Sequence, residues 1–285
     1  MASLCGVGRP LVLCAMFAIA SAGPAPAAEG ATLPPAPSAD IYYADPSSPD
    51  ISGFWRPASG VAREQYSFLD GIPLRREGGL QNDWPYTPAW RAADEARRKA
   101  SDEGRPFGDP LASCWPPGLV RAYVAANTPF EITQTPGRVQ LVHEKFGSVR
   151  RIYTDGRGHP KLDPSGFTLD GHSIGRWEGA TLIVDTVGIR RETTLSNVGL
   201  LHSERLHVVE RFTRVDPQTL TIEVVLEDPK AMTRPVRMSL TYTLSPGGEM
   251  IEDICPENNR DTPDANLVIQ TELGARKRYG FDLPE

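Results

Sequence analysis

The five histidines of this 285-residue chain all lie between positions 143 and 207. Histidine is the side chain whose ordinary pKa lies closest to neutral pH, so such a cluster is suited to moving protons or to binding a metal ion. One of them belongs to GHSIGRWEG at 171–179, where His172 and Arg176 share one face of an extended strand and Ser173 and Trp177 share the other. Periodicity alone leaves open which face points inward. The complete set is His143, His159, His172, His202 and His207.

Acid–base catalysis without a cofactor is the first interpretation of this cluster. A histidine would move the proton, a carboxylate would orient the imidazole ring, and an arginine would stabilise developing negative charge. These residue types are suited to lyase or isomerase chemistry. The sequence has no phosphate-cradling glycine pattern, so it predicts no nucleotide cofactor. The candidate catalytic residues are His172, His207, His202, Glu210, Arg176 and Asp185.

The substrate expected from the neighbouring side chains is a small apolar or aromatic molecule. Aromatic rings offer a large apolar surface, and those of tyrosine and tryptophan also carry a polar group that can orient a ligand. The candidate substrate-binding residues are Trp177, Tyr153, Phe212, Tyr242 and His159.

Two other interpretations remain open. The protein could be a metal-dependent enzyme, but His202 and His207 are five positions apart, on opposite faces of a regular strand, and no H-x-x-x-H or H-x-H pair stands near them. The sequence therefore names no metal ligands. Alternatively, histidine, arginine and glutamate on neighbouring strands satisfy one another through cross-strand pairs. The protein is then a non-catalytic ligand-binding or envelope protein.

The beginning of the chain has the pattern of a secretory signal peptide. A single Arg9 precedes the apolar run at 11–20, and the small residues Ala25-Pro26-Ala27 follow it. We expect residues 1–27 to be removed and the mature protein to be periplasmic or secreted, with no membrane span. Residues 28–52 predict a Pro/Ala-rich lead-in, and residues 53–285 a single domain.

Removal of residues 1–27 would leave two cysteines, Cys114 and Cys255. In an exported chain two cysteines favour one disulfide. Two separate buried thiols are the alternative, because the sequence does not show whether the two Cα atoms approach closely enough.

The charge of the chain argues against a polyanionic partner. The formal net charge is −6, and the pairs Arg75-Arg76, Arg150-Arg151 and Arg190-Arg191 are scattered. A nucleic-acid-binding surface requires clustered positive charge, so we expect no nucleic-acid partner. The sequence does not indicate an oligomeric state.

The second half of the chain predicts an antiparallel β meander. Short alternating runs are divided by turn signals such as TPGR, EGA and SPGGE, and their short links favour antiparallel pairing. Closure into a barrel removes the exposed edges of such a sheet. One helix is predicted at about 88–103, with Thr87 as its N-cap. The predicted strands are 130–134, 139–145, 149–154, 172–177, 181–187, 206–215, 219–227, 236–244 and 250–255.

Several longer motifs resemble a family of exported bacterial proteins that is functionally uncharacterised. The motifs are FEITQTPGRV, VRRIYTDGRGHP, GHSIGRWEGATLIVDTVG, LHVVERFTRVDPQTLTIEVVLEDP and CPENNRD, and they cover most of residues 106–262. This resemblance implies no catalytic role for any residue. Separately, Gly53-Phe54-Trp55 ahead of a β meander is similar to the G-x-W opening of lipocalins, which implies a lipocalin-like barrel. The helix predicted after it departs from the lipocalin pattern.

Overall fold

The computed structural model describes residues 45–58, 66–68, 84–102, 116–124, 129–196 and 199–253. The expected signal peptide lies outside these residues, and so do Cys114 and Cys255, whose pairing stays a prediction. The last part of the lead-in is described. Its Ile51 is buried in the hydrophobic core, and the Ile51 backbone N–H donates a hydrogen bond to Gln134 Oε1 (2.7 Å).

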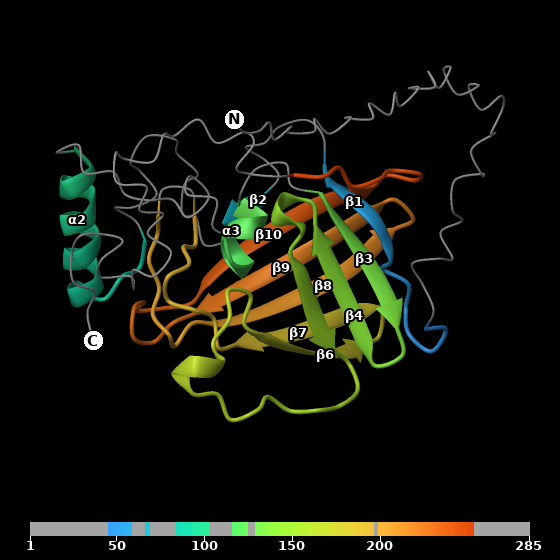
Figure 1. The fold of residues 1–285 in the computed structure, drawn as a ribbon, viewed down its shortest axis with the longest axis horizontal. Coiled ribbons are helices and arrows are strands. Elements are labelled where there is room, and N and C mark those ends of the chain that lie inside the picture. The colour runs from blue at the N-terminus through green and yellow to red at the C-terminus, as the bar shows by residue number, and fades with distance from the viewer. Residues whose placement is uncertain are drawn as a thin grey trace, which may run out of the picture. The chain divides into compact units, whose positions relative to one another are not determined.

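The described strands form a closed β-barrel, which confirms the predicted mainly β fold (Figure 1). Nine of them follow one another around the barrel from β1 through β3 to β10, and β10 pairs with β1 to close it. β2 pairs with the same edge of β10 farther along that strand. The strands are β1 (Gly53–Pro57), β2 (Tyr66–Phe68), β3 (Phe130–Thr135), β4 (Arg138–His143), β5 (Val149–Tyr153), β6 (His172–Glu178), β7 (Thr181–Val187), β8 (His207–Asp216), β9 (Thr219–Glu227) and β10 (Val236–Leu244).

The pairing of β5 with β6 departs from the predicted meander, because these two strands are parallel. Residues 154–171 return the chain so that β6 runs in the same direction as β5, which is the longer connection that a parallel pair needs. The ladder extends only over Ile152↔Ser173 and Tyr153↔Ile174, whereas β6 pairs with β7 along its whole length. We call this short parallel junction the β5–β6 seam.

The ninth strand of the barrel is also not the one predicted. Residues 250–253 form no strand, and 254–255 lie outside the described residues. β9 lies along one edge of β10, and β1 and β2 occupy the other, so β10 has no edge left for a following strand. β1, which contains the Gly-Phe-Trp opening, takes that place.

In β9 and β10 the core is built by alternation of inward apolar and mostly polar outward side chains. Burial of the apolar set is the main force that closes the sheet. Aromatic rings add contact area, with Phe130 of β3 and Tyr242 of β10 packed at a centroid distance of 4.5 Å. The inner positions of β9 and β10 are Leu220, Ile222, Val224, Leu226, Val236, Met238, Leu240 and Tyr242.

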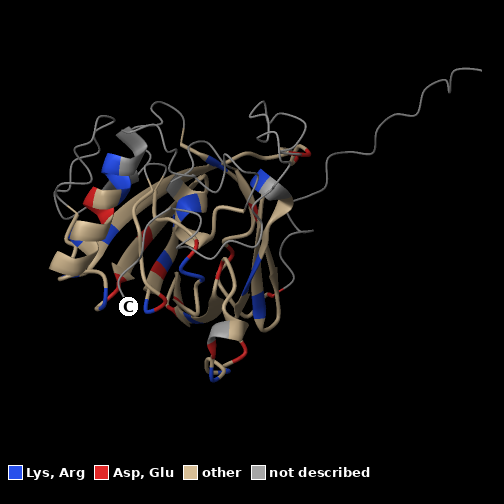
Figure 2. Ribbon diagram, turned by 60° about the vertical axis from the view of Figure 1, so that its left-hand side comes forward, with Lys and Arg blue, Asp and Glu red and all other residues tan. Residues whose placement is uncertain are grey.

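Two described α-helices accompany the strands. α2 (Pro88–Asp102) is the predicted inserted helix, and the Thr87 carbonyl accepts its first hydrogen bond from the Arg91 N–H (2.8 Å). α3 (Leu119–Val124) is short and was not predicted; it contributes the buried Tyr123. Acidic and basic positions are interspersed over the strands and α2 (Figure 2). Neither described helix has the length and apolar composition needed to span a membrane.

Gly175 provides a test of the packing at the β5–β6 seam. A Cβ at this position of β6 would lie 2.8 Å from Ile152 Cγ2 and 3.1 Å from Leu182 Cδ1, inside van der Waals contact. We expect Gly175→Ala to lower the free energy of unfolding by about 1–3 kcal/mol because the core must shift. Urea denaturation followed by tryptophan fluorescence measures this change.

Gly158 supplies the matched control. A Cβ there meets nothing within 4 Å, so Gly158→Ala should change the free energy of unfolding by less than about 0.5 kcal/mol. Equal stability of the two variants would contradict the packing described for β6.

Candidate functional site

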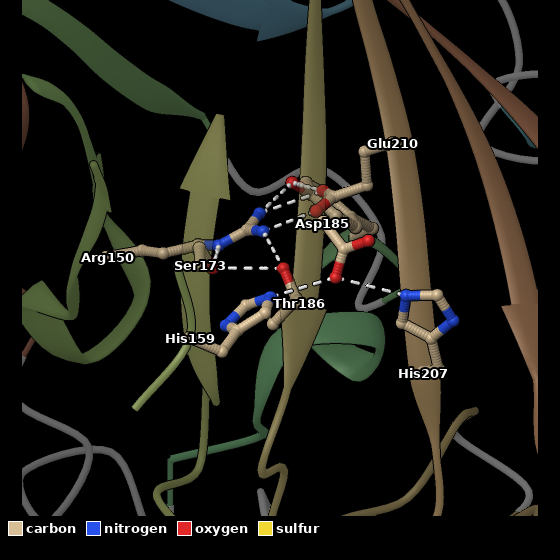
Figure 3. A network of polar contacts seen from close by, with 8 residues as sticks. Arg150, His159, Ser173, Asp185, Thr186, His207 and Glu210 are labelled. Atoms are coloured by element: carbon tan, nitrogen blue, oxygen red, sulfur yellow. Dashed lines mark hydrogen bonds and ion pairs between the residues drawn. The ribbon is translucent and has the colours of Figure 1, made fainter. Parts of the chain in front are cut away.

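Two polar networks lie on opposite faces of the strands β5 to β8 (Figure 3). Neighbouring residues of a strand point to opposite faces, so Ser173 and Thr186 face the barrel interior while His172 and Asp185 face outward. The inner network is Arg150, Glu210, Tyr123, Ser173 and Thr186. The outer network is Tyr153, His159, His172, Asp185, His207 and Glu227.

The inner network is centred on the guanidinium of Arg150. Arg150 Nη1 donates to Glu210 Oε1 (2.8 Å), and Arg150 Nη2 donates to Glu210 Oε2. Arg150 Nε donates to Ser173 Oγ (3.1 Å), and Nη2 also reaches Thr186 Oγ1 (2.9 Å). From α3, the Tyr123 hydroxyl donates to Glu210 Oε1 (2.7 Å). One side chain of β5 is thereby bonded to β6, β7 and β8.

Burial and pairing set the charges inside the barrel. Burial lowers the pKa of Arg150, but the Glu210 carboxylate and the Tyr123 hydroxyl outweigh this effect and raise it. Burial and the nearby Glu210 raise the pKa of Tyr123. Burial and the charge of Arg150 lower the pKa of His143 to about 4. Arg150 and Glu210 are therefore a buried ion pair, beside which His143 is neutral at pH 7.

The outer network is a line of imidazoles and carboxylates. His159 Nε2 lies 2.9 Å from Asp185 Oδ1, and His207 Nε2 lies 3.1 Å from the same oxygen. His159 Nδ1 lies 2.9 Å from His172 Nδ1, and His207 Nδ1 lies 3.3 Å from Glu227 Oε2. The side chains are partly exposed, 21% for His159 and 34% for Asp185, so small molecules in solution can reach the network.

The electrostatics of the outer network favour an ionised Asp185 and a neutral His172. Burial raises the pKa of Asp185, but hydrogen bonds from His159 and His207 outweigh it and lower the pKa below its ordinary value. Burial lowers the pKa of His172, and the neighbouring His159 and Arg157 lower it further. Asp185 is therefore ionised and His172 is neutral at pH 7.

The structure brings together part of the predicted site. His172, His207 and Asp185 of the candidate catalytic set meet on the outer face, and two candidate substrate-binding residues join them. His159 comes from the connection between β5 and β6, and the ring of Tyr153 stacks on His172 at 5.5 Å with an interplanar angle of 23°.

The other candidate catalytic residues lie elsewhere. Glu210 faces inward and belongs to the inner network. His202 is fully buried, with Nε2 2.8 Å from Thr193 Oγ1 and Nδ1 2.8 Å from the Ser203 carbonyl oxygen. Arg176 is exposed and pairs with Glu178 on its own strand (2.7 Å).

The remaining candidate substrate-binding residues belong to the barrel interior. Phe212 and Tyr242 are buried in the hydrophobic core, and Trp177 is partly buried against it. None of these three residues is the hydrogen-bond or ring-stacking partner of His172. A substrate that contacted them would lie away from the outer network.

Sequence reasoning missed four residues of the inner network, since only Glu210 was a candidate; Ser173 was placed on a strand face but given no role. Arg150 had an available signal, because it alternates with the buried Ile152 in VRRIY and so shares its inward face. Thr186 likewise alternates with the buried Val184. Tyr123 carries no such signal, since the short helix α3 has no recognisable pattern.

Metal binding finds no ready-made ligand set among the described residues. Within those ranges, no group of three or more His, Cys, Asp or Glu side chains is arranged to hold a metal ion. His159 in particular already directs one ring nitrogen at Asp185 and the other at His172.

Comparison with models of known protein families gives no match, and comparison with curated proteins gives none either. The basis for a function is therefore the geometry of the site.

His143 makes stability depend on pH. Its folded pKa of about 4 lies below the ordinary value of 6.5, so between these two values the unfolded chain binds a proton that the folded chain does not. The stabilisation is complete above pH 6.5 and is lost as the pH falls toward 4, by about 3 kcal/mol. The His143→Leu variant should lose this part of the pH dependence.

Urea denaturation at a series of pH values measures the effect. Val139→Ala, on the same inner face of β4, is the control, because it lowers stability without removing a titrating group. An unchanged slope between pH 6.5 and 4 in His143→Leu would show that His143 is not neutral in the folded barrel.

Proposed function

We propose that this protein is an exported enzyme that transfers a proton without a cofactor, with His172 as the general base. The observation that carries the proposal is the line of hydrogen bonds from His172 through His159 to Asp185. A base oriented by a second group, which is itself oriented by a third, is the arrangement that makes imidazole an effective catalyst. The closed barrel is compatible with ligand binding and supplies a rigid wall for the site.

The protons of this line can be assigned from the charge of Asp185. The ionised carboxylate accepts the Nε2–H of His159. In a neutral His159 ring, Nδ1 then has a free electron pair and accepts the Nδ1–H of His172. This leaves the electron pair of His172 on Nε2, for which the described residues provide no hydrogen bond. That atom is the proposed base.

Proton transfer along the line spreads the resulting charge. When His172 Nε2 takes a proton from the substrate, the Nδ1 proton can move across 2.9 Å to His159 Nδ1. The positive charge then lies on His159, in contact with the carboxylate of Asp185. The substrate is left with the negative charge, and Arg157, close enough to lower the pKa of His172, would stabilise it.

A small apolar or aromatic carbon acid fits the surroundings of His172. Ile174 and Val187 are partly buried on the same outer face, paired in register with Asp185 and His172 respectively. They provide apolar surface directly beside the proposed base and its supporting carboxylate. Removal of an α-carbon proton from a ketone or keto ester is the simplest reaction that such a site can catalyse, and it is the first half of an isomerisation or elimination.

Deuterium exchange tests this proposal without knowledge of the natural substrate. Wild-type protein in D₂O should exchange the α-protons of at least one member of a panel of aryl ketones and β-keto esters, followed by NMR. His172→Gln should lower the exchange rate by at least about a hundredfold, because general-base catalysis contributes that much. Asp185→Asn should lower the rate less.

Arg211→Gln is the matched control. Arg211 lies on the outer face of β8 and is 45% exposed, and it is not part of the outer network. Tight binding without exchange, or exchange that is equal in wild type and His172→Gln, would favour the non-catalytic ligand-binding or envelope protein. Stoichiometric zinc or iron in protein prepared without added metal would favour the metal-dependent alternative.

Export rests on the signal-peptide pattern of residues 1–27. Protein recovered from the periplasm or medium should begin just after Ala27, as N-terminal sequencing will show. Thiol titration of the unfolded mature chain should find no free thiol if Cys114 and Cys255 are bridged. An N-terminus at Met1 would exclude cleavage, and two free thiols would exclude the disulfide.

A further inference from the structure

We infer that Arg150 and Ser173 are positioning residues: on the inner face of the β5–β6 seam they hold the register that brings His172 against His159 and Tyr153. The effect of these residues on catalysis rests on the proposed function. Their structural effect, by which the inner network fixes the geometry of the outer network, is independent of that function.

The outer contacts of His172 both cross the β5–β6 seam. Tyr153 is the last residue of β5, and His159 follows it in the connection that leaves β5, whereas His172 is the first residue of β6. The stack of Tyr153 on His172 and the hydrogen bond between His159 and His172 therefore exist only while β5 and β6 keep their alignment.

The backbone pairing at this seam is short. It consists of Ile152↔Ser173 and Tyr153↔Ile174, the one parallel pairing among the described strands. Parallel ladders are slightly less stable per residue than antiparallel ones, and the neighbouring β6–β7 ladder runs along the whole of β6. A side-chain bond across the seam consequently has a large influence on its alignment.

Arg150 supplies that bond from the buried side. Its Nε donates to Ser173 Oγ at 3.1 Å, and Ser173 directly follows His172 in the chain. Both side chains are nearly inaccessible to water, at 3% and 1% exposure, so the bond does not exchange readily with solvent. Because the donor is charged, this is one of the stronger kinds of hydrogen bond.

The same guanidinium also aligns β7 and β8, the strands that carry Asp185 and His207 of the outer network. It bonds Thr186 of β7 and Glu210 of β8, and Asp185 is the residue before Thr186. The four strands held together on the inside are thus the four that carry Tyr153, His172, Asp185 and His207 on the outside.

Small displacements are sufficient to break the line of hydrogen bonds from His172 through His159 to Asp185. The rise per residue in a strand is about 3.3 Å, and a hydrogen bond weakens steeply beyond about 3.2 Å. A slip of β6 by half a residue, about 1.6 Å, would therefore lengthen the 2.9 Å contact between His159 and His172 beyond that range whenever it is not directed toward His159.

Ser173→Ala tests the inference with the smallest possible change. It removes the bond across the seam and leaves the Arg150–Glu210 pair intact. NMR of the folded protein, with labelled histidine and tyrosine, measures the nuclear Overhauser effects between the Tyr153 and His172 rings and the nitrogen shifts that report the shared proton of His159 and His172. We expect both signatures to be lost or strongly reduced.

Tyr123→Phe is the matched control. It removes a buried hydroxyl that bonds Glu210 and accepts from Arg150 Nη1 (3.0 Å), but it leaves the Arg150 Nε–Ser173 bond across the seam in place, so a merely structural role predicts equal effects in the two variants. We expect the Tyr123→Phe protein to keep the wild-type ring contacts. Arg150→Lys is the second variant, since lysine can pair with Glu210 but has no Nε–H to direct at Ser173.

The outcomes separate the two proposals. Unchanged ring signatures in Ser173→Ala and Arg150→Lys would overturn the positioning role, whatever the exchange assay shows. If wild-type exchange does not depend on His172, the proposed function fails, while the ring signatures still decide the positioning role. Where both hold, Ser173→Ala should lower kcat for exchange about ten- to a hundredfold with KM little changed.

Discussion

Arg150 and Glu210 meet inside the barrel, where either charge without the other would destabilise the fold by several kcal/mol. β5 and β8 are three strand spacings apart, about 14 Å along the sheet, so the two side chains must reach across β6 and β7. They can do so only because Ser173 and Thr186 are small at the intervening inner positions and offer hydroxyl groups to the guanidinium. The ion pair thus constrains the inner face of four consecutive strands.

The same constraint fixes the outer face. A register slip of one residue would exchange the two faces of a strand, taking His172 and Asp185 into the core and Ser173 and Thr186 out to water. Such a slip is unfavourable on both faces. The ion pair would lose the hydroxyl groups of Ser173 and Thr186, and the carboxylate of Asp185 would be buried among apolar side chains. The inner and outer networks therefore select the same register, although they share no side chain.

The sequence predicted the barrel better than it predicted the site, for reasons that particular strands make clear. β9 and β10 alternate cleanly because their inner residues are apolar and buried while their outer residues are mostly polar and partly or fully exposed. β7 and β8 carry polar groups on both faces, so the pattern could gather Asp185 and Glu210 in one candidate set but could not show that they point apart. The parallel pairing of β6 was hidden as well, because residues 154–171 carry the same turn signals as a hairpin link.

The outer network contains one more carboxylate than the line from His172 to Asp185 needs, and this carboxylate helps to place Asp185. His207 lies between Asp185 and Glu227, with Nε2 3.1 Å from Asp185 Oδ1 and Nδ1 3.3 Å from Glu227 Oε2. These contacts connect β7, β8 and β9 on the outer face. Asp185 is thus contacted from two sides, by His159 of the β5–β6 connection and by His207 of β8, so a shift of either segment would change the surroundings of the carboxylate that supports His172.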